Sequence, residues 1–239
     1  MVDSFEQTIE GLRAKVQALH NEVDLLVTFH EAWKPAAYDK ELHRRLDHSY
    51  AGNVFLIIRS ALRREMLLSL SRIWDHSGNT IQIQNITSKI KKPWFVNGLV
   101  KTRAAQQGDA DFDAALEAAF TKSRDECLRI YDKYVKGGSC YTVREDVSKL
   151  RHKRLAHREP KGFVLEDDAF PEGAIEGFYN DSVEIVRLLL ALILGLAYDP
   201  KETAEIYRGH ARCFWAAVCG ERTTGHPEFL KRTVKVIPS

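Results

Sequence analysis

The chain of 239 residues is 44% hydrophobic and 28% charged, which is the balance of an ordinary globular protein and excludes a disordered or membrane-embedded one. Lys and Arg number 35 and Asp and Glu number 33, so the net charge of +2 gives no general argument for nucleic-acid binding. Any site for a polyanion must therefore be local.

Cysteine usage and the terminal sequence exclude further classes. Cys127, Cys140, Cys213 and Cys219 form no Cys-x-x-Cys pair and have no histidine at zinc-finger spacing, so neither disulfides nor a metal site is expected. No Gly-rich loop indicates a nucleotide cofactor. The N-terminus does not resemble a signal peptide, and the apolar stretch 188–198 is too short to span a bilayer. We expect a cytoplasmic protein without membrane span, metal or cofactor.

Helical apolar spacing with few prolines predicts an all-α fold. In chain order, the spacing predicts helices over 4–33, 40–46, 50–75, 81–90, 109–135, from 141 to Pro160, 174–198 and 200–219. Pro35 is expected to end the first helix, and an irregular stretch through Pro93 and Gly98 is expected after the fourth. The segment 78–108 is interpreted as a lid or merely a connection.

One helical domain over 1–220 follows from this length, with the polar residues 221–239 as a tail.

Two charged residues fall on one side of the predicted helix 50–75. Counting about 100° per residue from Val54, Glu65 lies near 20° and Arg72 near 0°, on the side of the apolar residues Ile58 and Leu68, so both charges are expected to lie on a buried side of the helix. In one interpretation each charge finds a structural partner or points into a polar gap between chains. In the other, both belong to a functional site.

The most informative segment is Arg151-His152-Lys153-Arg154-Leu155-Ala156-His157. Between positions 144 and 158, six Lys and Arg stand against two acidic residues, a local net charge of +4 that would attract phosphate. Histidine titrates near neutrality, so it can take a proton from a ribose 2′-hydroxyl or give one to a leaving 5′-oxygen. Arginine adds fixed positive charge where the transition state becomes more negative.

Helical geometry restricts how this segment can act. Counting from Val143 at about 100° per residue, the apolar stripe through Val147 ends in Arg154 and His157, whereas Arg151 lies roughly 120° from His157. A site that uses Arg151 together with His157 therefore needs flexible reach, a frayed helix end or a second chain.

Residues Leu150 to Arg158 resemble the Arg-polar-x-x-x-x-His motif of the HEPN superfamily, in its bacterial abortive-infection-like branch. The helix order and the segment Arg72-Ile73-Trp74-Asp75 also resemble that branch. The resemblance implies a bundle of about four to five core helices, with extra terminal helices and a motif-bearing body over about 49–198. It also implies a homodimer in which the motif helices of two chains meet in a cleft.

In the ribonuclease members of that superfamily the motif Arg and His are the active residues, which correspond to Arg151 and His157 here. His152 takes the place of the polar residue that is often Asn or Asp in the family. The residues expected to support the site or bind phosphate are His152, Arg154, Arg158, Arg72 and Glu65.

The resemblance favours a metal-independent endoribonuclease that acts at a homodimer cleft as a toxin or phage-defence component. A non-catalytic HEPN module could instead bind RNA, a nucleotide or a partner protein through the same groove, because a fold does not guarantee chemistry. A third interpretation is an antitoxin-paired or structural protein, with an obligate interface formed by the basic run and the apolar segment 183–196.

Overall fold

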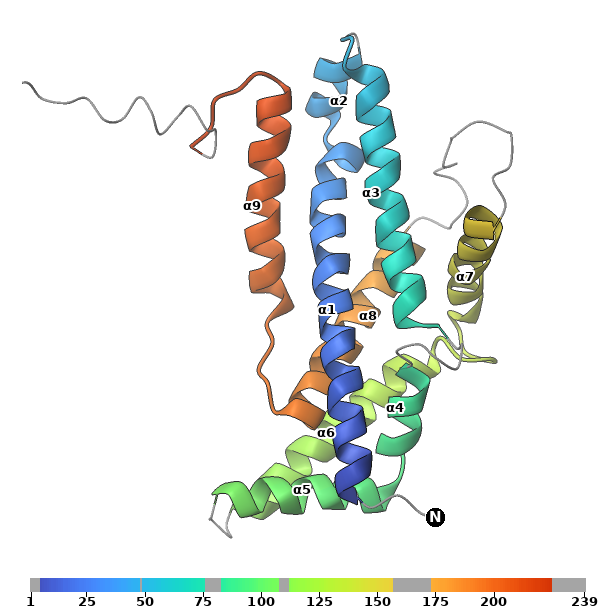
Figure 1. The fold of residues 1–239 in the computed structure, drawn as a ribbon, viewed down its shortest axis with the longest axis vertical. Coiled ribbons are helices and arrows are strands. Elements are labelled where there is room, and N and C mark those ends of the chain that lie inside the picture. The colour runs from blue at the N-terminus through green and yellow to red at the C-terminus, as the bar shows by residue number, and fades with distance from the viewer. Residues whose placement is uncertain (1–4, 48, 76–82, 108–111, 157–172, 225–239) are drawn as a thin grey trace, which may run out of the picture. The chain divides into compact units, whose positions relative to one another are not determined.

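The computed structural model describes residues 5–47, 49–75, 83–107, 112–156 and 173–224. Within these ranges the chain is helical and contains no strand, which confirms the predicted all-α fold (Figure 1). The helices are α1 (Phe5–Tyr38), α2 (Lys40–Asp47), α3 (Gly52–Ile73), α4 (Ile83–Ile90), α5 (Pro93–Gln107), α6 (Phe112–Asp132), α7 (Tyr141–Ala156), α8 (Ala174–Leu189), the π-helix η2 (Leu190–Leu194) and α9 (Pro200–Val218).

Two predictions that relied on proline are wrong. α1 continues through Pro35 to Tyr38, because the turn beyond the proline is held by packing: Ala36 is fully buried, and Trp215 Nε1 donates to the Ala32 carbonyl at 3.0 Å. The stretch after Pro93 is a helix rather than irregular chain. Proline fits the first helical position, where its missing N–H has no partner to lose.

The contacts of the chain divide it into two compact units. Unit 1 comprises residues 1–23 and 67–199, and unit 2 comprises residues 24–66 and 200–239. The division passes through α1 and α3, so each of these two helices contributes one part to each unit.

Unit 1 has an aromatic core around Trp74. Its indole ring lies parallel to the ring of Tyr131, with 5.8 Å between centroids, and contacts Tyr134 and Phe178 at 5.1 and 5.5 Å. The indole Nε1 donates to Ser182 Oγ at 2.9 Å, so the one polar atom of this large side chain is satisfied. The residue after α3 is thereby fixed against α6 and α8.

The apolar helix α8 is buried inside unit 1. Its inward residues include Val183, Val186 and Leu189. Burial within the chain leaves most of the segment 183–196 unavailable, so the expectation that this segment forms an obligate interface with another protein is wrong.

The end of this helical segment is set by a glycine. η2 forms one turn of wider helix and ends at Gly195, whose φ is 68°. A Cβ at this position would meet only the guanidinium of Arg103, the movable end of a flexible side chain, so it is the backbone angle that requires glycine. The N–H of Leu196 donates to the Leu190 carbonyl at 3.2 Å. The helix predicted to reach Tyr198 therefore ends at Leu194.

Unit 2 has a smaller core in which α2 closes one end. Leu42 and Leu46, one turn apart on α2, pack with Phe55 of α3 and Trp215 of α9. The Phe55 and Trp215 rings meet edge to face at 5.5 Å, so α3 and α9 touch within the core of unit 2. Asp39 Oδ1 accepts hydrogen bonds from the first turn of α2 and so caps it.

A buried carboxylate joins α1 to α9 in unit 2. The side chain of Glu31 is 3% exposed; its Oε2 accepts a hydrogen bond from Arg208 Nε at 3.0 Å, and its Oε1 lies 3.4 Å from His30 Nδ1 and 3.9 Å from Lys34 Nζ. Burial alone would raise the pKa of Glu31, but interactions with His30, Arg208 and Lys34 more than offset it. The pKa therefore lies below the usual 4.5.

Substitution of Glu31 by Gln tests this pair. Because the pKa of Glu31 is lower in the folded chain than in the unfolded one, its contribution is present above about pH 4.5 and lost as the pH falls. Glu31→Gln should lower the free energy of unfolding at pH 7 by about 1–3 kcal/mol, and by less at pH 4. Urea unfolding followed by circular dichroism measures both values. Glu41→Gln, which removes an exposed pair with Arg44, is the control and should have little effect. Equal losses at both pH values would contradict the assignment.

Because α1 and α3 each run through both units, we expect the chain to unfold as the single domain predicted from its length. The unchanged chain carries buried tryptophans in both units, Trp74 in unit 1 and Trp215 in unit 2. Its melting curves followed by tryptophan fluorescence and by far-ultraviolet circular dichroism should have the same midpoint. Midpoints that differ by more than the error of the measurement would show two domains.

Candidate functional site

The helix that carries the motif, α7, begins after a turn made by two glycines. Gly137 has a φ of 93°, and a Cβ at Gly138 would collide with the carbonyl oxygen of Lys133. The N–H of Cys140 donates to that same carbonyl at 2.8 Å and closes the turn. The predicted helix start at Tyr141 is confirmed.

The chain entering this turn is fixed by a polar cluster that the sequence analysis missed. Asp181 Oδ2 on α8 accepts hydrogen bonds from Tyr134 Oη and from Lys133 Nζ, each at 2.9 Å. Burial and then the bond to Asp181 raise the pKa of the Tyr134 hydroxyl, which keeps its proton. No local pattern links an aspartate of α8 to the end of α6.

The inward face of α7 carries both an apolar and a charged residue. Val147 is 2% exposed, as its place on the predicted stripe requires, and Arg144 is 9% exposed. The Arg144 guanidinium carbon lies 5.2 Å from the centroid of the Tyr141 ring, and its Nη2 lies 3.2 Å from Glu145 Oε1. α7 therefore places an arginine against the body of unit 1, seven residues before Arg151.

The motif residues lie at the end of α7 and beyond it. Arg151, His152 and Arg154 belong to the helical backbone, but their side chains lie outside what the structure describes. His157 and Arg158 follow the last described residue of α7 and lie outside the described residues altogether.

Arg72, the first of the two charged residues predicted on α3, forms an ion pair within unit 1. Its Nε donates to Glu22 Oε1 at 2.8 Å, and its Nη2 donates to Ser69 Oγ at 2.8 Å. The side chain is 41% exposed, so the expectation that this side of the helix is buried is wrong. Arg72 has the kind of structural partner that the first interpretation expects.

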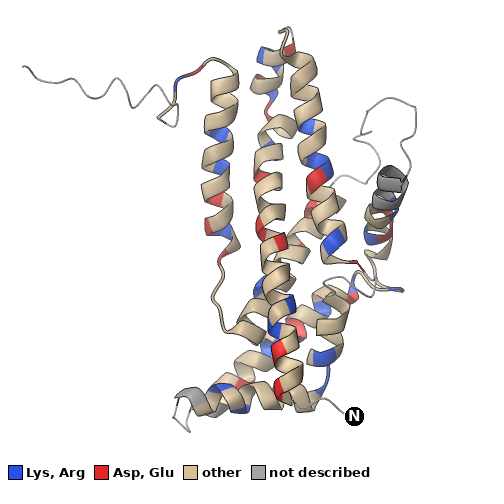
Figure 2. Ribbon diagram, viewed as in Figure 1, with Lys and Arg blue, Asp and Glu red and all other residues tan. Residues whose placement is uncertain are grey.

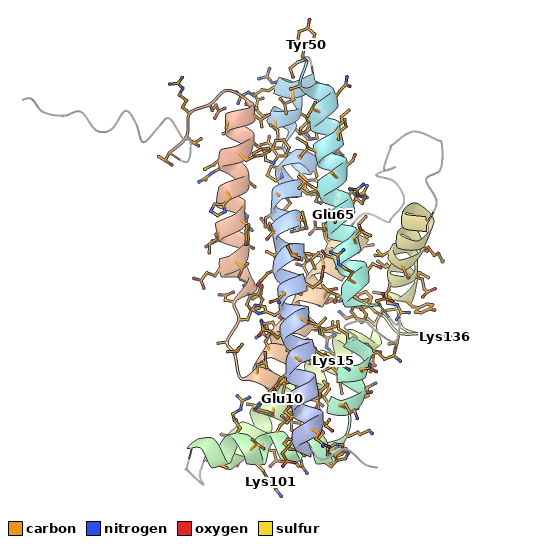
Figure 3. The ribbon with its side chains drawn as sticks, in the orientation of Figure 1. Glu10, Lys15, Tyr50, Glu65, Lys101 and Lys136 are labelled. Atoms are coloured by element: carbon orange, nitrogen blue, oxygen red, sulfur yellow. The ribbon has the colours of Figure 1, made fainter. Side chains whose placement is uncertain are left out.

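Glu65 lies on the same partly exposed side of α3, in unit 2 (Figure 3). Its Oε1 is 3.4 Å from Arg64 Nη2. The buried side of the helix carries Phe55, Met66 and Leu70, while Val54, from which the angles were counted, is 55% exposed. Glu65 and Arg72 are thus engaged in separate ion pairs.

The part of the chain that the structure describes contains no group of three His, Cys, Asp or Glu side chains placed to hold a metal ion. None of the described helices combines the length and the apolar character needed to cross a membrane. Burial raises the pKa of the Cys127 thiol to about 12, which makes this cysteine an unreactive core residue.

The comparison with protein families decides the identity of the fold. The model of the HEPN family named AbiU2 matches residues 9–214, from the first turns of α1 into α9. The chain belongs to the AbiU2 family of HEPN proteins. The resemblance seen in the sequence is thereby confirmed at the level of the superfamily and of its abortive-infection-like branch. No curated protein and no solved structure gave a match.

The AbiU2 family match covers parts of both units, since it includes α2 and α9 as well as α7.

Proposed function

We propose that this AbiU2-family protein is a metal-independent endoribonuclease that cleaves cytoplasmic RNA in a cleft between two copies of the chain. The observation that carries the proposal is the family match over residues 9–214 together with the Arg151 and His157 spacing at the end of α7. A role as a toxin or phage-defence component follows from the same family assignment.

The backbone register of α7 supports a role for Arg151. It stands four residues after Val147 and seven after Arg144, both of which are buried on the inward face. Arg151 therefore occupies the register of that face rather than the side of the helix, where counting from Val143 had put it.

The proposed chemistry needs only groups that the chain supplies. The ribose 2′-hydroxyl loses its proton to His157 and attacks the adjacent phosphorus, and the bond to the 5′-oxygen breaks. The departing oxygen takes a proton, so the products carry a 2′,3′-cyclic phosphate and a 5′-hydroxyl. Arg151 stabilises the extra negative charge on the phosphate. His157, protonated in the first step, then gives its proton to the departing oxygen.

A non-catalytic HEPN module remains the second candidate because His152 replaces the usual Asn or Asp of the motif. Such a module would bind RNA through the same basic run and release it unchanged.

Substitution of the two motif residues tests the catalytic proposal. Arg151→Ala and His157→Ala should each lower the rate of cleavage of a synthetic RNA by about 100-fold or more, with activity unaffected by a metal chelator. Gel analysis of the products measures the rate and the chemistry of the ends. His210→Ala and Arg212→Ala, exposed on α9, are matched controls that should retain full activity. Undiminished cleavage by either motif variant would refute catalysis at this site.

Mixing the two inactive variants tests whether the site is shared between chains. If Arg151 of one chain acts with His157 of its partner, half of the randomly formed dimers are mixed and each of these has one complete site. Activity should then return to about a quarter of the wild-type value. An inactive mixture that still contains heterodimers would place both residues of a site on one chain.

A further inference from the structure

The longest part of the sequence without a carboxylate has no role in the proposed cleavage site. No Asp or Glu stands between Asp75 and Asp109, and the described part of this segment forms α4 and α5. Its basic residues are Lys89, Lys91, Lys92, Lys101 and Arg103. In a chain with a net charge of only +2, these two helices are a local concentration of positive charge (Figure 2).

Some of this charge is already engaged within unit 1. Lys91 Nζ lies 3.2 Å from Asp132 Oδ1 and 5.7 Å from the centroid of the Tyr131 ring. The Arg103 guanidinium lies over the Phe120 ring, at 5.7 Å. These two residues therefore stabilise the fold.

Lys92 and Lys101 differ from them. Both side chains are exposed, and neither forms a hydrogen bond or an ion pair with any residue in the described ranges. Lys101 points away from the body of α5 (Figure 3). Two positive charges are therefore available to a ligand.

A tryptophan lies between these two lysines on the solvent face of α5. Trp94 is 46% exposed, and its ring meets that of the buried Phe95 edge to face at 5.7 Å, which supports it from one side. Asn97 and Lys101 follow at intervals of three and four residues and so lie on the same face of the helix. This face offers a stacking surface, an amide and one cation, and Lys92, which directly precedes the helix, adds a second cation about 14 Å from Lys101 along the helix axis.

The start of α5 adds to the positive electrostatic potential of this surface. The first turn contains no acidic residue that would neutralise the positive end of the helix dipole, and Lys92 directly precedes it. The N–H groups of Phe95 and Val96 donate to the Lys92 carbonyl, so the backbone from which the Lys92 side chain extends is ordered.

We propose that Lys92, Trp94, Asn97 and Lys101 form a binding surface for single-stranded RNA, separate from the cleavage motif of α7. A tryptophan face binds an unpaired base by stacking, and lysines on either side of it bind the phosphates that flank that base. An acidic peptide would use the lysines and leave the tryptophan unused, and a duplex would not present an open base face. The identity of the ligand as RNA rests on the proposed function, and the surface selects which strands reach the cleft.

The test measures binding of a fluorescent single-stranded RNA by anisotropy at several salt concentrations, using the full chain with Arg151→Ala and His157→Ala so that the RNA stays intact. Lys92→Glu with Lys101→Glu should weaken binding at least tenfold. The slope of log affinity against log salt should also become shallower by about 1.4, the value for two lost phosphate contacts. The control pair Lys40→Glu and Lys136→Glu changes the net charge equally, at exposed positions elsewhere, and should alter affinity less than twofold.

Tryptophan variants separate stacking from charge. Trp94→Ala should weaken binding about tenfold, and Trp94→Phe, which keeps an aromatic face, should retain most of the affinity. Unchanged RNA binding by Trp94→Ala, or equal losses for the control and test lysine pairs, would overturn the proposal. The same lysine pair is also tested for binding to vesicles of anionic lipid. If it loses vesicle binding while its RNA binding is unchanged, the proposal is overturned and the surface is assigned to a membrane.

The two proposals fail in different ways. If Arg151→Ala abolishes cleavage while the lysine pair changes neither RNA affinity nor the KM for cleavage, only the binding surface is refuted. If Arg151→Ala leaves cleavage intact while the lysine pair still weakens binding, the cleavage site is refuted and the binding surface stands.

Discussion

The burial of Trp74 is the constraint on which unit 1 depends. Its indole, placed one residue after α3, touches aromatic rings from α6 and α8 and donates its single hydrogen bond to Ser182. Three helices that are distant in sequence are thereby fixed at one point. Tyr134 belongs to the same cluster and is bonded to Asp181, so the end of α6 is fixed there as well. Everything that follows, including the turn and the start of α7, is built on that anchored end.

From this base extends α7, which carries the backbone of Arg151, the first residue of the proposed motif. Its inward face is defined by Val147 and Arg144, and the backbone register carries that face on to Arg151. An arginine buried at 9% exposure within one chain, beside Tyr141, keeps the first half of the helix in one rotational position. The geometry of any site made by the second half depends on that rotation, because a turn of about 100° per residue moves a side chain to another face.

The sequence predicted the class of fold and the positions of most helices because these depend on local spacing and on glycine. The turn at Gly137 and the helix start at Tyr141 are of this kind. Prediction failed where distant contacts override local preference: the turn after Pro35 is held by packing against α9, and α3 is apolar on nearly every side, so its periodicity could not identify the buried face.

The candidate site shows the same limit. The Arg151 to His157 segment could be singled out from its residue types and spacing. The partner of Arg72 could not, since Glu22 lies fifty positions away on another helix. The same holds for the bond between Tyr134 and Asp181, which depends on how α6 and α8 pack.

The π-helix at Leu190–Leu194 has a consequence for how the chain tolerates changes in length. A π-turn holds one more residue than an α-turn over nearly the same span. Removing one residue there would restore ordinary α-helical winding, and Gly195 could still end the segment. The same deletion within α8 would rotate every later side chain of that helix by about 100° and would turn its apolar face away from the core. Within the α8–η2 segment, this turn is where a single-residue gap would cost least.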